Sequence, residues 1–220
     1  MQKIAILDLG TGNIASLSNR IILTIEKFNK NASLSVLTPQ QFIEGCNNID
    51  KLILPGVGNF AFYSKHFFSF AGLEDAVKNF AIKKHILGIC VGMQFLLDQS
   101  TESGINKGLG LIKGNVEHFT ANLGFDKNLK VPHMGWNNLL LNKNCKSNLF
   151  ANFADTELGD FYFVHSYYCK PVDANSIIAF ANYSFDFAAA ISCGFVHGVQ
   201  FHPEKSSLKG ELMLDGFLGM

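Results

Sequence analysis

The residue best suited to covalent chemistry is Cys90, which lies between Gly88 and Gly92 in the stretch HILGICVGMQFLL, residues 85–97. An apolar run typical of a buried strand precedes it, and the residues after it favour a helix. A nucleophile at such a strand–helix turn needs flanking glycines, because its backbone is strained and crowded. A helix starting at Val91 would also lower the pKa of the thiol and favour the thiolate. The alternative is a buried structural cysteine beside a helix-packing glycine.

A nucleophilic cysteine needs a base, and the stretch VQFHPEKS places His202 two residues before Glu204. Pro203 favours an extended conformation at His202, and in an extended chain residues i and i+2 point the same way. A carboxylate beside an imidazole can orient the ring and stabilise its protonated form. The alternative is a surface loop with a solvated histidine and glutamate. Together with the glycine-flanked cysteine, the pair predicts a catalytic Cys90, His202 and Glu204.

A third candidate element is LPGVGNF, residues 54–60, where a predicted strand ends in a proline and two glycines. The loop of Gly56, Val57 and Gly58 can bring bare backbone N–H groups close to a substrate. With the N–H group of Val91, it would form an oxyanion hole. The alternative is an ordinary turn after a strand.

The elements that must position these residues alternate between strands and helices in the first half of the chain. This alternation predicts an α/β fold with a mostly parallel central sheet flanked by helices. Strand-like runs in the second half predict an added antiparallel β layer, and no linker divides the single domain expected over residues 1–220. The expected strands are 3–8, 34–37, 51–54 and 86–89, with strand-like runs at 108–119, 161–168, 176–184 and 188–203; the expected helices are 14–28, 61–82 divided at Gly72, 91–98 and 207–218.

Composition narrows the class of protein. Among 220 residues the formal net charge is zero and 16% are charged, which argues against a nucleic-acid or anionic-membrane surface. No apolar run approaches the length of about 18 residues that a membrane span needs. The five cysteines are an odd number without a C-x-x-C pair, so neither a disulfide framework nor a zinc knuckle is expected. A cytoplasmic protein is the expectation.

Six motifs together carry a family resemblance: LDLGTGNI, LPGVG, GICVGMQ, VPHMGWN, FYFVHSY and GVQFHPEKS. In this order they resemble the class I (triad) glutamine amidotransferases over nearly the whole chain. The motifs PHMGWN and FVHSY narrow the resemblance to the glutaminase subunits of imidazole glycerol phosphate synthase, from histidine biosynthesis. GxCxG and HPE alone indicate only a triad amidotransferase.

The resemblance implies a mechanism for the hydrolysis of L-glutamine to glutamate and ammonia. The Cys90 thiolate attacks the side-chain amide, His202 transfers protons and Glu204 orients His202. Backbone N–H groups at Val57 and Val91 hold the oxyanion, and no cofactor is needed. Gln94 lies one helical turn after Cys90, on the nucleophile's side of the helix. The implied substrate-binding residues are Gly56, Gly58, Gln94, Ser166 and Tyr167.

The resemblance also implies a partner, a (β/α)8 barrel synthase subunit that binds as a heterodimer and receives the ammonia. Residues that match the family's docking face are Asn13, His133, Trp136, Asn137 and Lys205. One alternative is a paralogous subunit that feeds ammonia to a synthase modifying a surface-polysaccharide sugar. Others are a cysteine hydrolase or deglycase with the same turn, and a degenerate binding module. No metal site is expected, because three or four converging ligands would be needed.

Overall fold

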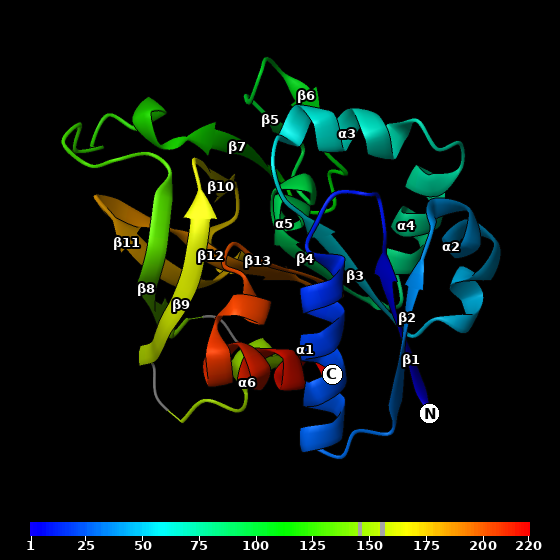
Figure 1. The fold of residues 1–220 in the computed structure, drawn as a ribbon. Coiled ribbons are helices and arrows are strands. Elements are labelled where there is room, and N and C mark those ends of the chain that lie inside the picture. Colours follow the sequence, from blue (N-terminus) through cyan, green and yellow to red (C-terminus); the bar gives the residue numbers. More distant parts are fainter. Residues whose placement is uncertain (145–146, 155–156) are drawn as a thin grey trace.

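The computed structural model describes residues 1–144, 147–154 and 157–220. Their strands form one mixed sheet in the order β2-β1-β3-β4-β13-β12-β10-β7-β5-β6, and β11, β8 and β9 branch from β12 (Figure 1). The first five strands in this order run parallel, so their carboxyl ends meet at one edge. They are β2 (Ala32–Leu37), β1 (Gln2–Leu7), β3 (Lys51–Gly56), β4 (His85–Cys90) and β13 (Val196–Val199).

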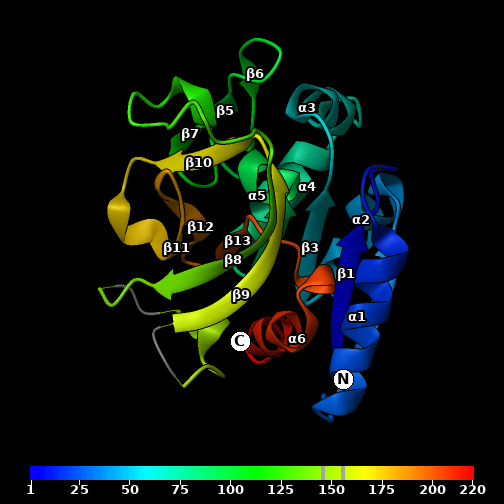
Figure 2. The ribbon, with the colours of Figure 1, turned by 60° about the vertical axis from the view of Figure 1, so that its left-hand side comes forward.

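The antiparallel strands continue this same sheet, because β12 pairs with β13. The strands β8 and β9 form a long curved pair that reaches the sheet through β11 (Figure 2). The expected α/β fold is confirmed, with a mixed sheet in which the antiparallel strands join the parallel ones directly. These strands are β5 (Gln99–Ser100), β6 (Asn106–Lys107), β7 (Gly114–His118), β8 (His133–Leu141), β9 (Glu157–His165), β10 (Tyr167–Pro171), β11 (Ile177–Tyr183) and β12 (Phe185–Cys193).

Helices cover the parallel strands. Helices α1 and α6 lie side by side and pack against each other. Helices α2 and α4 form a second packed pair (Figures 1 and 2). Strand β3 is buried along its whole length, as expected of a parallel strand covered on both faces. The helices are α1 (Ile14–Lys27), α2 (Pro39–Gly45), α3 (Phe60–Phe68), α4 (Leu73–Ala81), α5 (Val91–Phe95) and α6 (Ser207–Leu218); one-turn 3-10 helices are η1 (Cys46–Asn48), η2 (Phe119–Ala121), η3 (Asn148–Phe150), η4 (Ala174–Ser176) and η5 (Pro203–Lys205).

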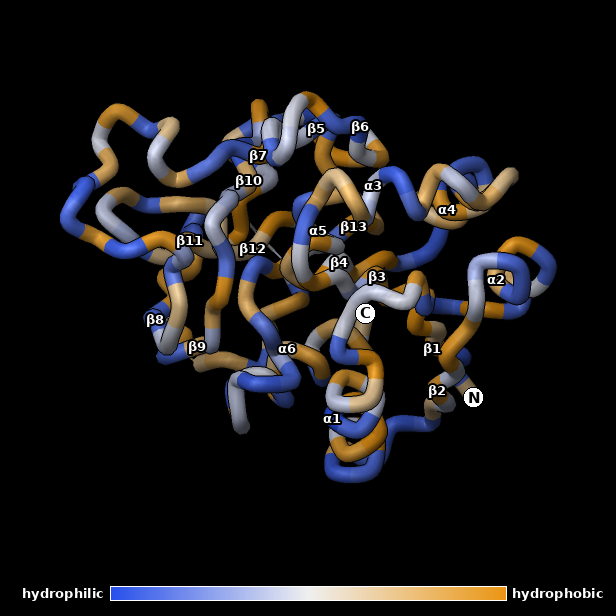
Figure 3. The backbone as a smooth tube through the Cα atoms, turned by 45° about the horizontal axis from the view of Figure 1, so that its top comes forward, coloured by the Kyte–Doolittle hydropathy of each residue, from blue (hydrophilic) through white to orange (hydrophobic). Residues whose placement is uncertain are grey.

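Local sequence explains how several helices begin and which face they bury. In α1, Leu17, Ile21 and Thr24 are buried at helical spacing, and hydrophobic and hydrophilic residues alternate around the turns (Figure 3). The side chain of Asn13 caps this helix by accepting from the N–H of Ser16. Gly72, with φ of +83°, divides α3 from α4 as expected. Among the described residues, no helix is long and apolar enough to cross a membrane.

Two helices differ from the sequence prediction. Helix α2 was not expected, although Thr38 and Gln41 form a reciprocal capping box around Pro39. Helix α5 ends at Phe95, whereas the prediction extended it to residue 98. The carbonyl groups of Phe95 and Leu97 accept hydrogen bonds from residues 109 and 110, so a distant loop takes the acceptors that a longer helix would leave unpaired.

Candidate active site

Cys90 ends β4 and immediately precedes α5, at the carboxyl edge of the parallel strands. Its φ of +55° and ψ of −110° are strained for a residue with a side chain, as expected of a nucleophile on a sharp turn. Both flanking glycines are required by close backbone approach. A Cβ on Gly88 would lie 2.5 Å from the carbonyl oxygen of Gly92, and one on Gly92 would lie 1.8 Å from that of Leu54.

The short α5 changes the expected electrostatic support for a thiolate. A helix of five residues has only a small macrodipole, so its first free N–H groups provide most of the favourable interaction with a negative charge. The strand β3 contributes the other side of the turn, because Gly56 is the register partner of Cys90. A Cβ on Gly56 would lie 2.8 Å from the Tyr63 ring, which explains the glycine there.

His202 follows β13, the parallel neighbour of β4, so the topology brings it to the same edge as Cys90. The backbone of His202 is extended, and its N–H donates to the carbonyl of Tyr162 over 2.9 Å. The chain then turns into η5, which brings a carboxylate oxygen of Glu204 to 2.9 Å from Nδ1 of His202. The two side chains meet as predicted, through one extended residue followed by a 3-10 turn.

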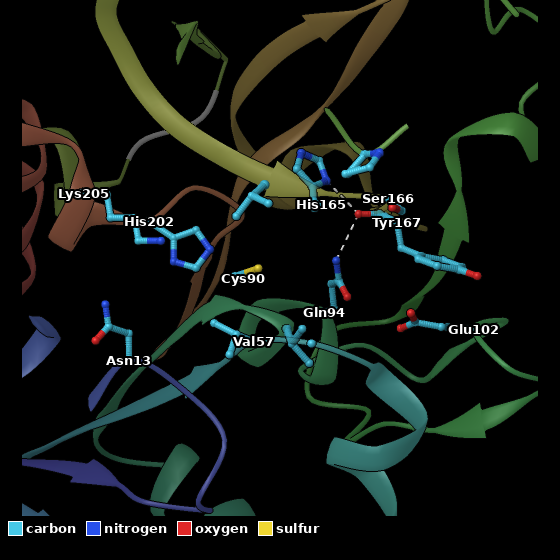
Figure 4. A pocket seen from close by; sticks show the side chains of 14 residues that line it. Asn13, Val57, Cys90, Gln94, Glu102, His165, Ser166, Tyr167, His202 and Lys205 are labelled. Carbon is cyan, nitrogen blue, oxygen red and sulfur yellow. Dashed lines mark hydrogen bonds between the residues drawn. The ribbon is translucent and has the colours of Figure 1, made fainter. Parts of the chain in front are cut away.

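Two neighbouring groups favour the charged form of His202. Burial alone lowers the pKa of the ring, but the Cys90 sulfur and the Glu204 carboxylate outweigh burial and raise the pKa above its ordinary value. Nε2 of His202 and Oε2 of Glu204 are buried and have no hydrogen-bond partner within the described parts of the chain. The Nε2 edge of the ring faces Cys90 in the pocket (Figure 4). A proton can therefore pass between the thiol and this ring.

A pocket of about 450 Å³ opens above Cys90 and collects most of the predicted site residues (Figure 4). His133, Trp136 and Asn137 do not line it, and Gly56 and Glu204 line a smaller adjoining cavity that shares Asn13, Val57 and His202 with it. Val57 is exposed at the rim, and Gly58 has a φ of +89°, which favours glycine. Predicted residues that line the pocket are Asn13, Val57, Gly58, Cys90, Val91, Gln94, Ser166, Tyr167, His202 and Lys205.

Gln94 is the centre of a polar network in this pocket. Its Nε2 donates to the carbonyl of Tyr167 over 3.0 Å and to Oε1 of Gln200 over 3.1 Å. Nε2 of Gln200 lies 3.7 Å from the Cys90 sulfur. Sequence reasoning missed Gln200, although its place two residues before His202 was a usable signal, because alternate residues of an extended chain share a side.

Sequence reasoning also missed two other polar residues of the pocket, Glu102 and His165. One carboxylate oxygen of Glu102 accepts from the N–H of Phe60 over 2.6 Å, at the start of α3. His165 is buried, and Nδ1 of its ring lies 2.8 Å from the carbonyl of Tyr167. No local pattern singles out Glu102, whereas His165 is the histidine of the FVHSY motif, next to the predicted Ser166 and Tyr167, which was a usable signal.

The residues expected at a partner interface are placed at different depths. Trp136 is 54% exposed on β8, where Met134 and Leu140 on the same face are also exposed. Asn13 and Lys205 lie at the pocket, and the Lys205 ammonium sits 5.4 Å from the centre of the Tyr162 ring. His133 is only 4% exposed, so it lies beneath this face. Asn137 is half-buried between the surface and His133.

No group of three or more metal-ligating side chains converges within residues 1–144, 147–154 and 157–220. The fold does assemble a buried thiol and an imidazole with a raised pKa at one pocket, and a buried carboxylate contacts the far side of that imidazole. These groups can carry out nucleophilic attack and proton transfer on an amide or ester.

Comparison with known proteins agrees with this chemistry. Residues 6–218 match the family described as glutamine amidotransferase class-I. The chain is 40% identical to the imidazole glycerol phosphate synthase subunit HisH of Sulfurimonas denitrificans, covering 97% of this chain and 96% of that protein. It is 37% identical to the HisH subunit of Methylococcus capsulatus, covering 99% and 96%. The fold resembles the acivicin-bound glutaminase domain of Trypanosoma brucei CTPS, with a TM-score of 0.66, 14% identity and coverage of 99% and 92%.

Proposed function

The chain belongs to the class-I glutamine amidotransferases and, within them, to the HisH subunits of imidazole glycerol phosphate synthase, and we propose that Cys90 is its glutaminase nucleophile. The single observation that carries this proposal is that Cys90 and His202 line one pocket while the Glu204 carboxylate holds His202 from behind, 2.9 Å from its Nδ1. The reaction is hydrolysis of L-glutamine to glutamate and ammonia, as the nitrogen-supplying step of histidine biosynthesis.

In the proposed reaction, the Cys90 thiol gives its proton to Nε2 of His202 and its sulfur attacks the amide carbon of glutamine. The raised pKa of His202 favours this transfer, because the thiolate and the imidazolium stabilise each other. The imidazolium then protonates the leaving ammonia, which breaks the C–N bond and leaves a thioester. Water, deprotonated by His202, hydrolyses the thioester to glutamate. Backbone N–H groups of Val57 and Val91 are the proposed donors to the oxyanion.

Four pocket residues are the proposed ligands of the glutamine substrate. The α-ammonium group of the substrate needs an anion, and Glu102 is the carboxylate in the lining outside the triad. Gln94, Ser166 and Tyr167 lie around the same end of the pocket and offer hydrogen bonds to the α-carboxylate and the amide. Gly58, which lines the pocket, leaves room for the substrate chain.

The released ammonia must reach an acceptor, and the proposed partner is a (β/α)8 barrel synthase subunit in a cytoplasmic heterodimer. The name of the relatives describes them as subunits, which supports a complex. The exposed apolar residues Met134, Trp136 and Leu140 of β8 form a face beside the pocket, and such residues favour a protein interface. Asn13 and Lys205 at the pocket complete the proposed docking face.

The test is glutamate release from L-glutamine by the chain alone and with its barrel partner and the partner's ligand. Cys90→Ala is expected to lower the rate by at least about 10³-fold, because the nucleophile is lost. Cys193→Ala is the matched control, since Cys193 is an exposed cysteine at the end of β12, away from the pocket. Unchanged turnover in Cys90→Ala, or equal loss in both variants, would refute the assignment of Cys90.

A further inference from the structure

A row of hydrogen bonds connects the exposed β8 strand with the glutamine pocket. Nε2 of His133 lies 3.1 Å from Nδ2 of Asn137, and Nδ1 of His133 lies 3.1 Å from Nε2 of His165. Nδ1 of His165 lies 2.8 Å from the backbone carbonyl of Tyr167. His133 and His165 are register partners on β8 and β9, so the strand pairing itself sets the two rings against each other.

The two ends of this row fix the position of every proton in it. The Tyr167 carbonyl can only accept, so Nδ1 of His165 carries the hydrogen and Nε2 is the acceptor. His133 must therefore donate from Nδ1 and accept at Nε2. The donor to that Nε2 is the Asn137 amide, whose orientation is set because it also donates to the carbonyl of Asn182 over 2.8 Å. All donors point toward the pocket.

The surroundings of the two rings allow only this neutral arrangement. Both are buried, and the ring of Tyr183 stacks on His133 at 4.3 Å, with Phe119, Phe163 and Phe187 around them. The titratable groups facing them are Tyr183, whose hydroxyl donates to the carbonyl of Lys130, and His202, whose charge disfavours a second charge on His165. Burial lowers the pKa of His133 to about 4 and that of His165 to about 3.

The row continues to the nucleophile. The Tyr167 carbonyl also accepts from Gln94, which donates to Gln200, and the amide of Gln200 points to the Cys90 sulfur. The backbone carbonyl of Tyr167 thus accepts hydrogen bonds from both His165 and Gln94. If His165 adopted its other tautomer, a lone pair of Nδ1 would face the lone pairs of this carbonyl and push it out of place.

We propose that His133 and Asn137 are positioning residues of the glutaminase site, which hold His165 in the Nδ1–H tautomer and thereby fix the Tyr167 carbonyl and Gln94. This inference rests on the proposed function for its kinetic readout. It assigns His133, expected from the resemblance at the docking face, to an internal link between that face and the pocket. Asn137 is the outer end of this link, on the strand whose exposed side is the proposed docking surface.

The direct test is the ring ¹⁵N–¹H spectrum of the full chain at pH 7, which distinguishes the tautomers without any need for activity. His133 and His165 are expected to be neutral and protonated at Nδ1. In His133→Phe, which keeps a ring but removes both hydrogen bonds, His165 is expected to show a mixture of tautomers. The kcat/KM for glutamine should fall about 10-fold, as expected for a lost hydrogen bond to a buried group.

A second variant, Asn137→Asp, replaces the amide donor by an acceptor. The row can then persist only if His133 carries both protons, and the new carboxylate raises the pKa of His133 from its value of about 4. Below that raised pKa, His133 can still donate from Nδ1 to His165, and the row of hydrogen bonds is intact. Above it, His133 keeps the proton that faces the new carboxylate, and the hydrogen bond to His165 is lost. We therefore compare kcat/KM of the variant with that of the wild-type chain at a saturating concentration of the partner. This ratio is expected to fall about 10-fold as the pH rises through the raised pKa of His133. Asn138→Asp is the matched control, because its exposed side chain receives the same charge change one residue away, and its ratio should stay flat.

Nε2-protonated or charged rings at pH 7 in the wild-type chain would overturn the proposal. So would the same pH dependence in Asn137→Asp and Asn138→Asp, since a general charge effect would then suffice. Failure of the proposed function would be recognised separately, as absence of glutamate release by the wild-type chain with its partner. In that case the tautomers in wild-type and His133→Phe chains still decide whether the row exists and whether His133 maintains it.

Discussion

His197 lies near the start of β13, and His202 lies three residues after the end of this strand. Their surroundings shift the pKa values of the two rings in opposite directions. Both are almost completely buried, with exposures of 4% and 2%. His197 contacts the hydroxyl of Ser192 over 2.8 Å and Nδ1 of His85 over 2.9 Å, and its pKa is lowered to about 3 by burial and by the nearby His85 and Lys51. His202 contacts a carboxylate and faces the Cys90 thiol, and its pKa is raised despite burial.

The difference separates a structural polar cluster from a reactive one. At the amino end of the parallel strands, the ammonium of Lys51 donates to the carbonyls of Phe217 and Leu218, which leaves the polar groups there internally paired. At the carboxyl end, buried atoms of His202 and Glu204 lack partners in the described structure. Buried polar groups that are paired stabilise a fold, whereas buried groups that stay unpaired at a pocket indicate a site of chemistry.

The largest expected effect comes from removing the feature that distinguishes His202. Glu204→Gln keeps the shape of the side chain but removes its charge, so the pKa of His202 should fall and its environment should approach that of His197. We expect kcat for glutamate release to fall by about 10² to 10⁴-fold, as for the orienting carboxylate of other triads.

The control for this change is Glu211→Gln, which removes a carboxylate of α6 that pairs with Arg20 and Lys27 of α1. It should lower stability, because the Glu211 carboxylate is only 12% exposed and interacts with both cations, and leave kcat nearly unchanged. If kcat fell less than about 3-fold in Glu204→Gln, the carboxylate would not be the group that orients His202.

The opposite change should make His197 resemble His202. Ser192→Asp places a carboxylate against Nδ1 of His197, and an opposite charge at contact distance favours the protonated ring. We expect the pKa of His197 to rise from about 3 toward its ordinary value, measured by NMR titration of the ring. Ser192→Asn is the isosteric control and should leave the pKa low, because the amide carries no charge. A pKa that stays near 3 in both variants would mean that burial, rather than the missing carboxylate, sets the difference between the two histidines.

The last prediction concerns the stability of the chain in acid. Because the pKa of His197 is about 3 when folded and 6.5 as a reference, the unfolded chain binds one more proton between these pH values. The free energy of unfolding therefore decreases as the pH falls through this window, by up to about 1.4 kcal/mol per pH unit from this group. His197→Gln should remove that part of the slope, measured by urea unfolding at several pH values.

Ser192→Ala serves as the comparison here, because it removes the hydroxyl partner but keeps the imidazole and should retain the acid slope. If His197→Gln and the wild-type chain lost stability equally between pH 6.5 and pH 3, His197 would not be a buried neutral histidine.

Much of the local structure follows from the sequence, and the exceptions have tertiary causes. The closing helix 207–218 and the division of the third predicted helix at Gly72 are found as expected. The run 161–168 reads as one strand, but β9 ends at His165 and β10 begins at Tyr167. The break at Ser166 occurs because the two strands pair with different neighbours, β8 and β7, and local pattern does not specify those partners.

The sequence by itself determined the chemical identity of the site: a glycine-flanked cysteine after a strand, and a histidine and glutamate spaced to meet. These features are local, because a strained turn and a two-residue spacing depend on neighbouring residues alone. Only the tertiary structure decided that β13 lies beside β4, which brings His202 to Cys90, and that Gln200, Glu102 and His165 join them. The same packing decided which buried histidine meets a carboxylate, and therefore which one is charged.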